Sequence, residues 1–213
     1  MIAIRSLLRL GAAGALALGL AGCISLLPKS KPAQLYRFAP QSAATAKAPP
    51  GAAAVGVFSG GGEFQRESQS DRILTITGDK AAYIAEARWA APAEVLFDQA
   101  VDAAFETSGG HVRLVPRGAP APTDYVLRLD VRNFETRYDA GAKAAPTVRV
   151  RLHAALTRDR SRTLVSEQVF EANVPASDNR VSAIVAAYDR AVSDVLGKLV
   201  SWTNGAASAA PAA

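Results

Sequence analysis

The sequence contains few of the side chains that most often carry out chemistry. Its 213 residues include one cysteine, one methionine and two histidines. A single cysteine excludes a disulfide within the chain and a zinc site built from several thiolates. His111 and His153 lack metal-ligand spacing to another ligand, and the Gly-x-Ser-x-Gly turn of many hydrolases is missing. We therefore predict no catalytic residue, no metal site and no cofactor.

The chain also lacks long runs of like charge. Its formal net charge of +5 comes from 24 basic and 19 acidic residues, which are spread along the whole length. Nucleic-acid-binding surfaces usually show clustered basic residues, often with aromatic residues between them. The mild excess of basic residues therefore does not indicate nucleic acid as a partner.

No apolar run is long enough to span a membrane, but a shorter one lies near the N-terminus. It extends from Leu10 to Ala21, and about a dozen residues fall short of the roughly 20 that a spanning helix needs. Arg5 and Arg9 precede the run, and the sequence Leu-Ala-Gly-Cys ends it at Cys23. This order is typical of an export signal that is cut before a cysteine. We predict a lipoprotein signal peptide over residues 1–22.

Cys23 is the predicted lipidation site, carrying a covalent S-diacylglycerol and an N-acyl chain. An unpaired thiol in an exported protein is open to oxidation, and acylation removes it. The alternative is an ordinary secretory signal followed by a buried cysteine. Residue 24 is isoleucine, whereas an aspartate there retains lipoproteins at the inner membrane of enteric bacteria. We therefore expect an anchor in the outer membrane, facing the periplasm.

The rest of the chain predicts one folded domain with flanking segments. We expect a lipidated tether over residues 23–34, a domain over 35–203 and a disordered tail over 204–213, which is rich in alanine, glycine and serine. Three glycines, Gly60 to Gly62, are not followed by the lysine of a phosphate-binding loop, and we predict a flexible loop there.

Hydrophobic spacing predicts two helices and eight strands. One helix begins at Pro92 and ends before Gly109, and a longer one follows Pro175 and ends near Thr203. Strands are predicted over residues 35–38, 53–59, 73–77, 81–89, 112–115, 125–132, 148–154 and 164–174. These elements predict an α+β fold, a two-layer sandwich in which two main helices pack on one face of a mostly antiparallel sheet.

Two sets of charged residues are candidates for a site. Asp98, Asp102 and Glu106 recur every four residues on the first helix, and a solvated helix face explains them better than paired catalytic carboxylates do. Four arginines at strand positions would line one sheet face, where guanidinium groups suit lipid headgroups or an acidic partner protein. The alternative is an ordinary solvent-exposed face. These residues are Arg128, Arg132, Arg149 and Arg151.

Several short motifs resemble those of the ABC-type transport auxiliary lipoproteins, the family that includes the lipoprotein of the paraquat-inducible operon. Besides the cysteine motif and the early strand at residues 36–38, they are Asp71–Leu74, Ala82–Ala85 and Ala87–Pro92. The resemblance covers roughly residues 23–202. It departs at residues 60–70, where many relatives have a proline and a Tyr-Leu pair.

The resemblance implies a non-enzymatic accessory subunit, anchored in the outer membrane, of a mammalian-cell-entry-type system that moves lipids between the inner and outer membranes. The ATPase, the permease and the lipid-channel subunit would be separate proteins. The lipid-channel subunit would be the partner of this chain. The resemblance further implies that several copies of this chain form a ring. Arg88 and Trp89, before the first helix, are a candidate partner-binding site, with a core tryptophan as the alternative. A lipoprotein that activates a cell-wall synthase is the competing role.

Overall fold

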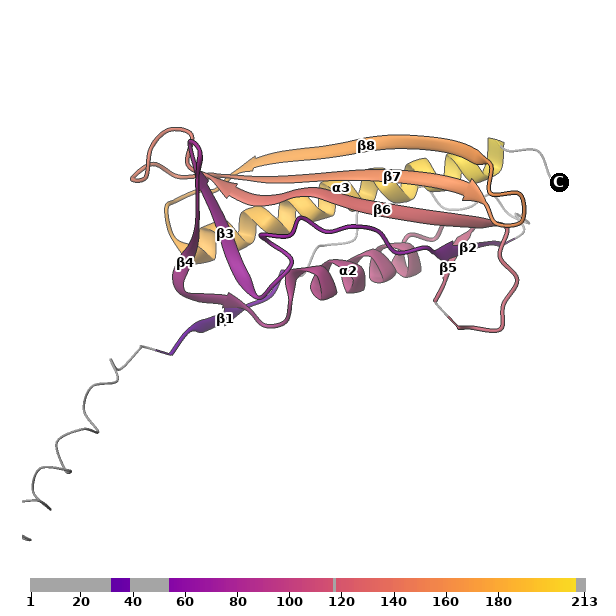
Figure 1. Cartoon of the computed structure of the whole chain (residues 1–213), viewed down its shortest axis with the longest axis horizontal. Coiled ribbons are helices and arrows are strands. Elements are labelled where there is room, and N and C mark those ends of the chain that lie inside the picture. The colour runs from indigo at the N-terminus through magenta and orange to yellow at the C-terminus, as the bar shows by residue number, and fades with distance from the viewer. Residues whose placement is uncertain (1–31, 39–53, 117, 210–213) are drawn as a thin grey trace, which may run out of the picture. The chain divides into compact units, whose positions relative to one another are not determined.

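The computed structural model describes residues 32–38, 54–116 and 118–209 (Figure 1). The chain divides into two compact units, Met1–Pro32 and Ala33–Ala213, and all the helices and strands named below belong to the second. The predicted signal peptide, the lipidation site Cys23 and most of the predicted tether lie outside the described residues. No helix in the described ranges combines the length and the hydropathy needed to cross a membrane.

All of the strands and both helices expected from the sequence are present, with shifted ends. The helices are α2 (Ala93–Thr107) and α3 (Val181–Ala209). The strands are β1 (Gln34–Tyr36), β2 (Val55–Ser59), β3 (Arg72–Thr77), β4 (Lys80–Trp89), β5 (Val112–Val115), β6 (Tyr125–Arg137), β7 (Thr147–Arg158) and β8 (Leu164–Pro175).

Strand β6 is the centre of the sheet. β7 pairs with one edge of β6 and β8 pairs with β7, both antiparallel. The other edge of β6 pairs with β2 near its start and with β3 near its end, both parallel. β3 and β4 form an antiparallel hairpin, whereas β1 pairs with β4 and β5 with β2 in parallel. The α+β class is confirmed.

The expectation of a mostly antiparallel sheet is wrong, because the sheet is mixed. Four of the seven strand pairings among the described residues are parallel. Side chains alternate between the two faces in both kinds of pairing, so alternation in the sequence carries no information about strand direction. The direction is set here by long connections, such as the one through α2 that separates β2 from β5.

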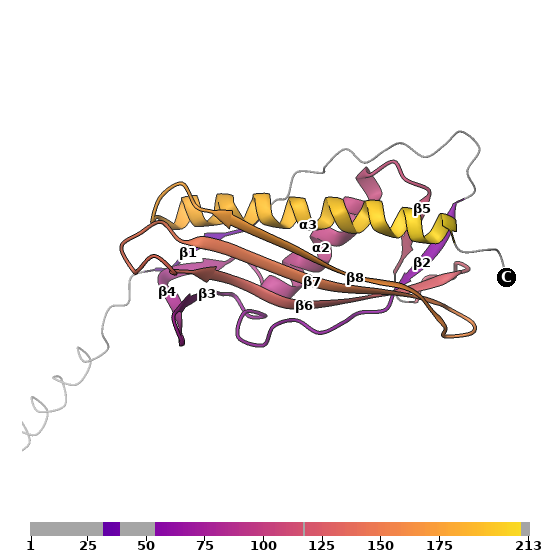
Figure 2. The same cartoon turned by 90° about the horizontal axis from the view of Figure 1, so that it is seen from above.

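Both helices share one hydrophobic core with the inner face of the sheet. Helix α3 packs against β7 and β8, and α2 packs against α3 and β5 (Figures 1 and 2). The ring of Phe134, on β6, lies 4.8 Å from Tyr188 of α3 and 6.3 Å from Phe97 of α2, measured between ring centroids. The two helices therefore meet the same side of β6, which agrees with the predicted layering.

Helix α3 is longer than the sequence predicted. Residues 204–209, expected to begin a disordered tail, continue the helix to Ala209. The side chain of Asn204 accepts a hydrogen bond from the backbone N–H of Val112 at 3.1 Å, and Ala207 is buried. Alanine is the best helix former, and these contacts with the start of β5 hold the last turns in place. Residues 210–213 lie outside the described residues.

Candidate functional site

The Arg88–Trp89 pair divides between the surface and the core. The Trp89 side chain is 2% exposed, and its ring meets those of Phe38 and Tyr188 at centroid distances of 5.3 and 5.1 Å. Arg88 is half exposed and forms an ion pair with Asp71 at 3.2 Å. Only Arg88 is thus available to a partner in this conformation, and the position of Trp89 matches the alternative of a core tryptophan.

Three of the four candidate arginines are paired with acids, which lie on the neighbouring strand or on the same strand. Arg149 and Arg151 lie 3.1 and 3.6 Å from the carboxylate of Glu171 on β8, and Arg128 lies 3.0 Å from Asp130. The side chain of Asn173 donates a hydrogen bond to Glu171 and lowers the pKa of that carboxyl, and the nearby charges of both arginines lower the pKa further. The sheet face therefore carries both signs of charge.

Arg132 differs from the other three arginines. It is exposed and lies where a bulge shifts the pairing of β6 with β7, between Val131 and Asn133. Within the described residues, the structure brings Arg149 and Arg151 together on one acid but does not gather all four arginines into one cluster.

The triple glycine lies in a segment without regular secondary structure, as the sequence predicted, and this segment is hydrogen-bonded to strand β6. Residues 60–64 run along the edge of β6, where the Gly60 N–H donates to the Leu127 carbonyl at 2.9 Å. The Val131 N–H donates to the Glu63 carbonyl at 2.7 Å. A Cβ atom at Gly62 would overlap the carbonyl oxygen of Leu129. Glycine is needed at position 62 because the two backbones approach closely there, and Gly61 has a φ of 70°, which other residues rarely adopt.

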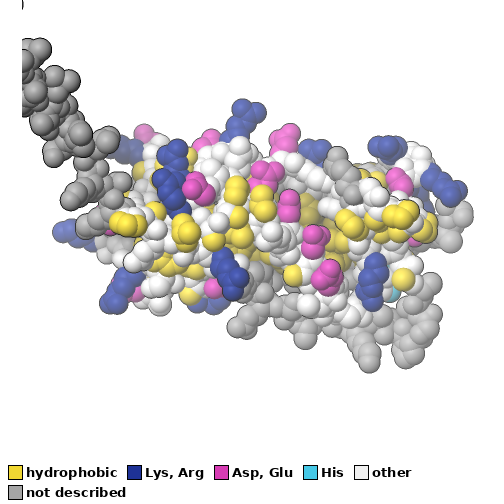
Figure 3. All heavy atoms as spheres, turned by 90° about the horizontal axis from the view of Figure 1, so that it is seen from below, with side chains coloured by type: hydrophobic (Ala, Val, Ile, Leu, Met, Phe, Trp, Pro, Cys, Tyr) yellow, Lys and Arg dark blue, Asp and Glu magenta, His cyan; other side chains and the backbone are white. Residues whose placement is uncertain are grey.

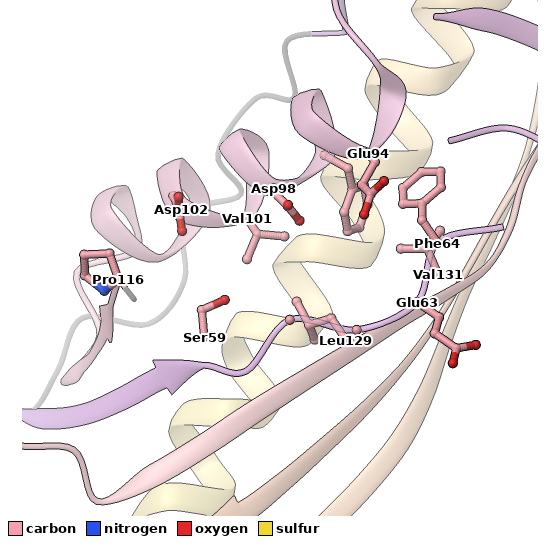
Figure 4. Close-up of a pocket in the computed structure, with 13 residues that line it drawn as sticks. Ser59, Glu63, Phe64, Glu94, Asp98, Val101, Asp102, Pro116, Leu129 and Val131 are labelled. Carbon is pink, nitrogen blue, oxygen red and sulfur yellow. The ribbon is translucent and has the colours of Figure 1, made fainter. Parts of the chain in front are cut away.

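A pocket of about 310 Å³ lies between this segment and helix α2. Carboxylates of Glu94, Asp98 and Asp102 stand on the side of α2 that faces the segment, while Glu63 points away on the opposite side (Figure 4). The floor is apolar and aromatic. It is formed by Phe64, Phe97, Val101, Leu129 and Val131.

The three α2 carboxylates at the pocket have no basic partner in the described part of the chain. Among the described residues, no ion pair involves Glu94, Asp98 or Asp102. Burial raises the pKa of Asp98, and the nearby charges of Glu94 and Asp102 raise it further. Burial and the charge of Glu106 raise the pKa of Asp102. On the face seen in Figure 3, acidic side chains form a row across the middle, beside exposed hydrophobic surface.

Removing two of these charges is expected to stabilise the fold. Like charges four residues apart on a helix destabilise it by about 0.2–0.5 kcal/mol per pair. Asp98→Asn with Asp102→Asn removes the repulsion between Glu94 and Asp98, between Asp98 and Asp102, and between Asp102 and Glu106. We expect the free energy of unfolding, measured by urea denaturation at pH 7, to rise by about 1 kcal/mol.

The pH dependence of that gain tests its cause. A carboxyl whose pKa is raised by folding destabilises the folded state while it is ionised. The penalty is full above the folded pKa, declines as the pH falls through it, and is absent below the unfolded value of about 3.9. The gain should therefore disappear near pH 3. An equal gain at pH 3 and pH 7 would show that charge is not the cause, and Glu67→Gln with Asp79→Asn, on exposed acids outside the pocket, should change little.

The sequence predictions missed this pocket, although its parts are visible in the sequence. The glycines and the row of acids on α2 were each noticed, but they are separated by some thirty residues, and only the fold places them face to face. The unpaired acids were the available signal, because α2 carries no basic residue in its last turn or elsewhere. Among the described residues, no group of three or more His, Cys, Asp or Glu side chains is placed to hold a metal ion.

Solved structures with similar folds exist. The crystal structure of protein XCC0632 from Xanthomonas campestris is 25% identical in sequence, covers 82% of this chain and 97% of its own, and has a TM-score of 0.69. The crystal structure of an uncharacterized protein is 14% identical, covers 82% of this chain and 95% of its own, and has a TM-score of 0.53. The second likeness concerns the fold alone. No curated protein matches the sequence.

A family model also matches the sequence, over residues 68–200. The matched span begins at Ser68, before β3, and ends at Val200, within α3, so it includes α2, most of α3 and six of the eight strands. The family is described as the ABC-type transport auxiliary lipoprotein component.

Proposed function

Since the chain belongs to the family of ABC-type transport auxiliary lipoprotein components, we propose that it is the outer-membrane-anchored accessory subunit of a mammalian-cell-entry-type lipid transport system. It would face the periplasm and work without enzymatic activity of its own. The ATPase, the permease and the lipid-channel subunit would be separate proteins, and this domain would hold the lipid-channel subunit at the outer membrane.

The family match over residues 68–200 is the observation that carries this proposal. The sequence around Cys23 supports the anchor, because a basic segment, a short apolar run and Leu-Ala-Gly-Cys occur in the order of a lipoprotein signal. Ile24, in place of an aspartate, supports the outer membrane as the destination. A tether of residues 23–34 would reach at most about 40 Å when fully extended.

The charge distribution favours a protein partner over lipid headgroups. A headgroup phosphate would have to compete with Glu171 for Arg149 and Arg151, and with Asp130 for Arg128. Separating such pairs loses charge-assisted hydrogen bonds on both sides. We therefore propose that the domain binds the lipid-channel subunit by surface contact and does not itself hold the transported lipid. A ring of copies around the channel is part of the proposal.

Affinity purification from native membranes tests this role. The full-length lipoprotein with a C-terminal tag would be cross-linked in intact cells, solubilised and purified, with an unrelated outer-membrane lipoprotein carrying the same tag as the control. We expect the lipid-channel subunit among the specifically enriched proteins, with the permease and ATPase at lower yield. Recovery of no transport component would contradict the proposal. Recovery of a penicillin-binding protein instead would support the role in cell-wall synthesis.

A further inference from the structure

The acids of α2 that line the pocket differ from many acids on the sheet and on α3, which have basic partners. Asp130 pairs with Arg128, Glu171 with Arg149, and Asp194 with Lys198 at 2.6 Å, four residues further along α3. Glu94, Asp98 and Asp102 form no ion pair among the described residues, although the whole chain has more basic than acidic residues. The pocket wall thus has a negative charge that the described part of the chain leaves uncompensated, and a cationic ligand would complement it.

The apolar floor of the pocket favours a ligand that has apolar groups as well as cations. Phe64 is partly buried and its ring lies 6.0 Å from that of Phe97, and both rings contact Phe134 in the core. Aromatic faces attract cations, and the neighbouring Leu129 and Val131 offer aliphatic surface. A simple inorganic cation would leave this apolar floor in contact with water. The better ligand has basic and apolar groups side by side.

The spacing of the carboxylates suggests an extended peptide. Residues four apart on a helix are separated by about 6 Å along its axis, so the row from Glu94 to Asp102 extends about 12 Å. Alternate residues of an extended chain point to the same side and are separated by about 6.6 Å. A strand-like segment with basic residues at alternate positions would place them opposite successive carboxylates. The side chains between these basic residues would face the apolar floor of the pocket.

We propose that the groove between α2 and residues 61–64 binds an extended segment of a partner protein in which basic and apolar residues alternate. The segment's cations lie against Glu94, Asp98 and Asp102, and its apolar side chains lie against Phe64 and Leu129. This interaction goes beyond the transport role and does not depend on which protein supplies the segment.

Fluorescence anisotropy with labelled peptides tests the proposal. The full-length lipoprotein in a zwitterionic detergent is titrated against a five-residue peptide of alternating lysine and leucine, and against a peptide of the same composition with the three lysines in sequence. We expect the alternating peptide to bind about tenfold more tightly than its rearranged control, and its binding to weaken with added salt. Equal binding of the two peptides, or no saturable binding of either, would overturn the proposal.

Matched variants locate the binding surface. Asp98→Asn with Asp102→Asn should weaken binding of the alternating peptide about tenfold. Glu67→Gln with Asp79→Asn removes the same charge outside the groove and should leave binding unchanged. Because the pocket variant is expected to be more stable than the parent, lost binding would not result from unfolding, and a thermal melt checks this. Unchanged binding of the pocket variant would place the peptide elsewhere and overturn the proposal.

Discussion

Replacing Cys23 with alanine is expected to prevent lipidation. As a result, the protein should be lost from the outer-membrane fraction. In the proposed lipoprotein, the Cys23 sulfur is the atom that would carry the diacylglyceryl group, and the sequence contains no second cysteine that could take its place. Each buried methylene contributes about 0.8 kcal/mol, and one acyl chain alone binds membranes only marginally. Loss of all three acyl chains should therefore lower the ratio of membrane-bound to soluble protein by orders of magnitude. Sucrose-gradient flotation with immunoblotting measures the shift, and mass spectrometry of the N-terminal peptide measures the lipid.

A neighbouring variant separates anchoring from sorting. Ile24→Asp keeps the cysteine and should keep the lipid, while in an enteric host it should hold the protein at the inner membrane. Retention of Cys23→Ala in the outer membrane would contradict the assignment of the anchor. Identical fractions for Ile24→Asp and the parent would contradict only the proposed sorting.

Replacing Trp89 with alanine is expected to lower the free energy of unfolding by about 3–5 kcal/mol. The side chain is almost fully buried and contacts the rings of Phe38, Phe134 and Tyr188, so its removal leaves a cavity at the centre of the aromatic core. Urea denaturation followed by circular dichroism measures the loss, and Trp202, on α3, remains as a fluorescent reporter.

Arg88→Ala is the matched control for that experiment. Arg88 precedes Trp89 and pairs with Asp71 at the surface, and exposed ion pairs contribute about 1 kcal/mol or less. We expect Trp89→Ala to unfold the domain in much less urea than Arg88→Ala. The Trp89→Ala variant could instead be as stable as the parent but no longer co-purify with the lipid-channel subunit. The tryptophan would then be a binding residue, and its assignment to the core would be wrong.

The elements of this fold were predictable because they depend on local patterns. The apolar stripe of α3 and the alternation along β7 both follow from burial of one face. The last part of β6 was not predicted, because the bulge after Val131 interrupts the alternation and returns Phe134 to the core. A bulge depends on the partner strand, so the sequence of one strand does not reveal it.

The candidate site was harder to predict because it depends on contacts between distant segments. The arginines of β6 and β7 were recognised, but Glu171, the acid that pairs with Arg149 and Arg151, lies on β8. The acids of α2 were interpreted as a solvated face, and the fold places Asp98 and Asp102 in the wall of a pocket. In both cases the residue types were visible, whereas the neighbour that gives them a role was not.

Strand β1 sets how this domain would respond to mechanical force. Any pull on a lipidated N-terminus enters the domain at β1, which pairs with β4 over three residues only, from Gln34 to Tyr36. The β6–β7 and β7–β8 pairings are much longer, whereas β3 pairs with β6 over two residues. Under load, β1 would therefore detach before β6, β7 and β8 separate from one another. The domain would then stay folded while the distance between the two membranes changes.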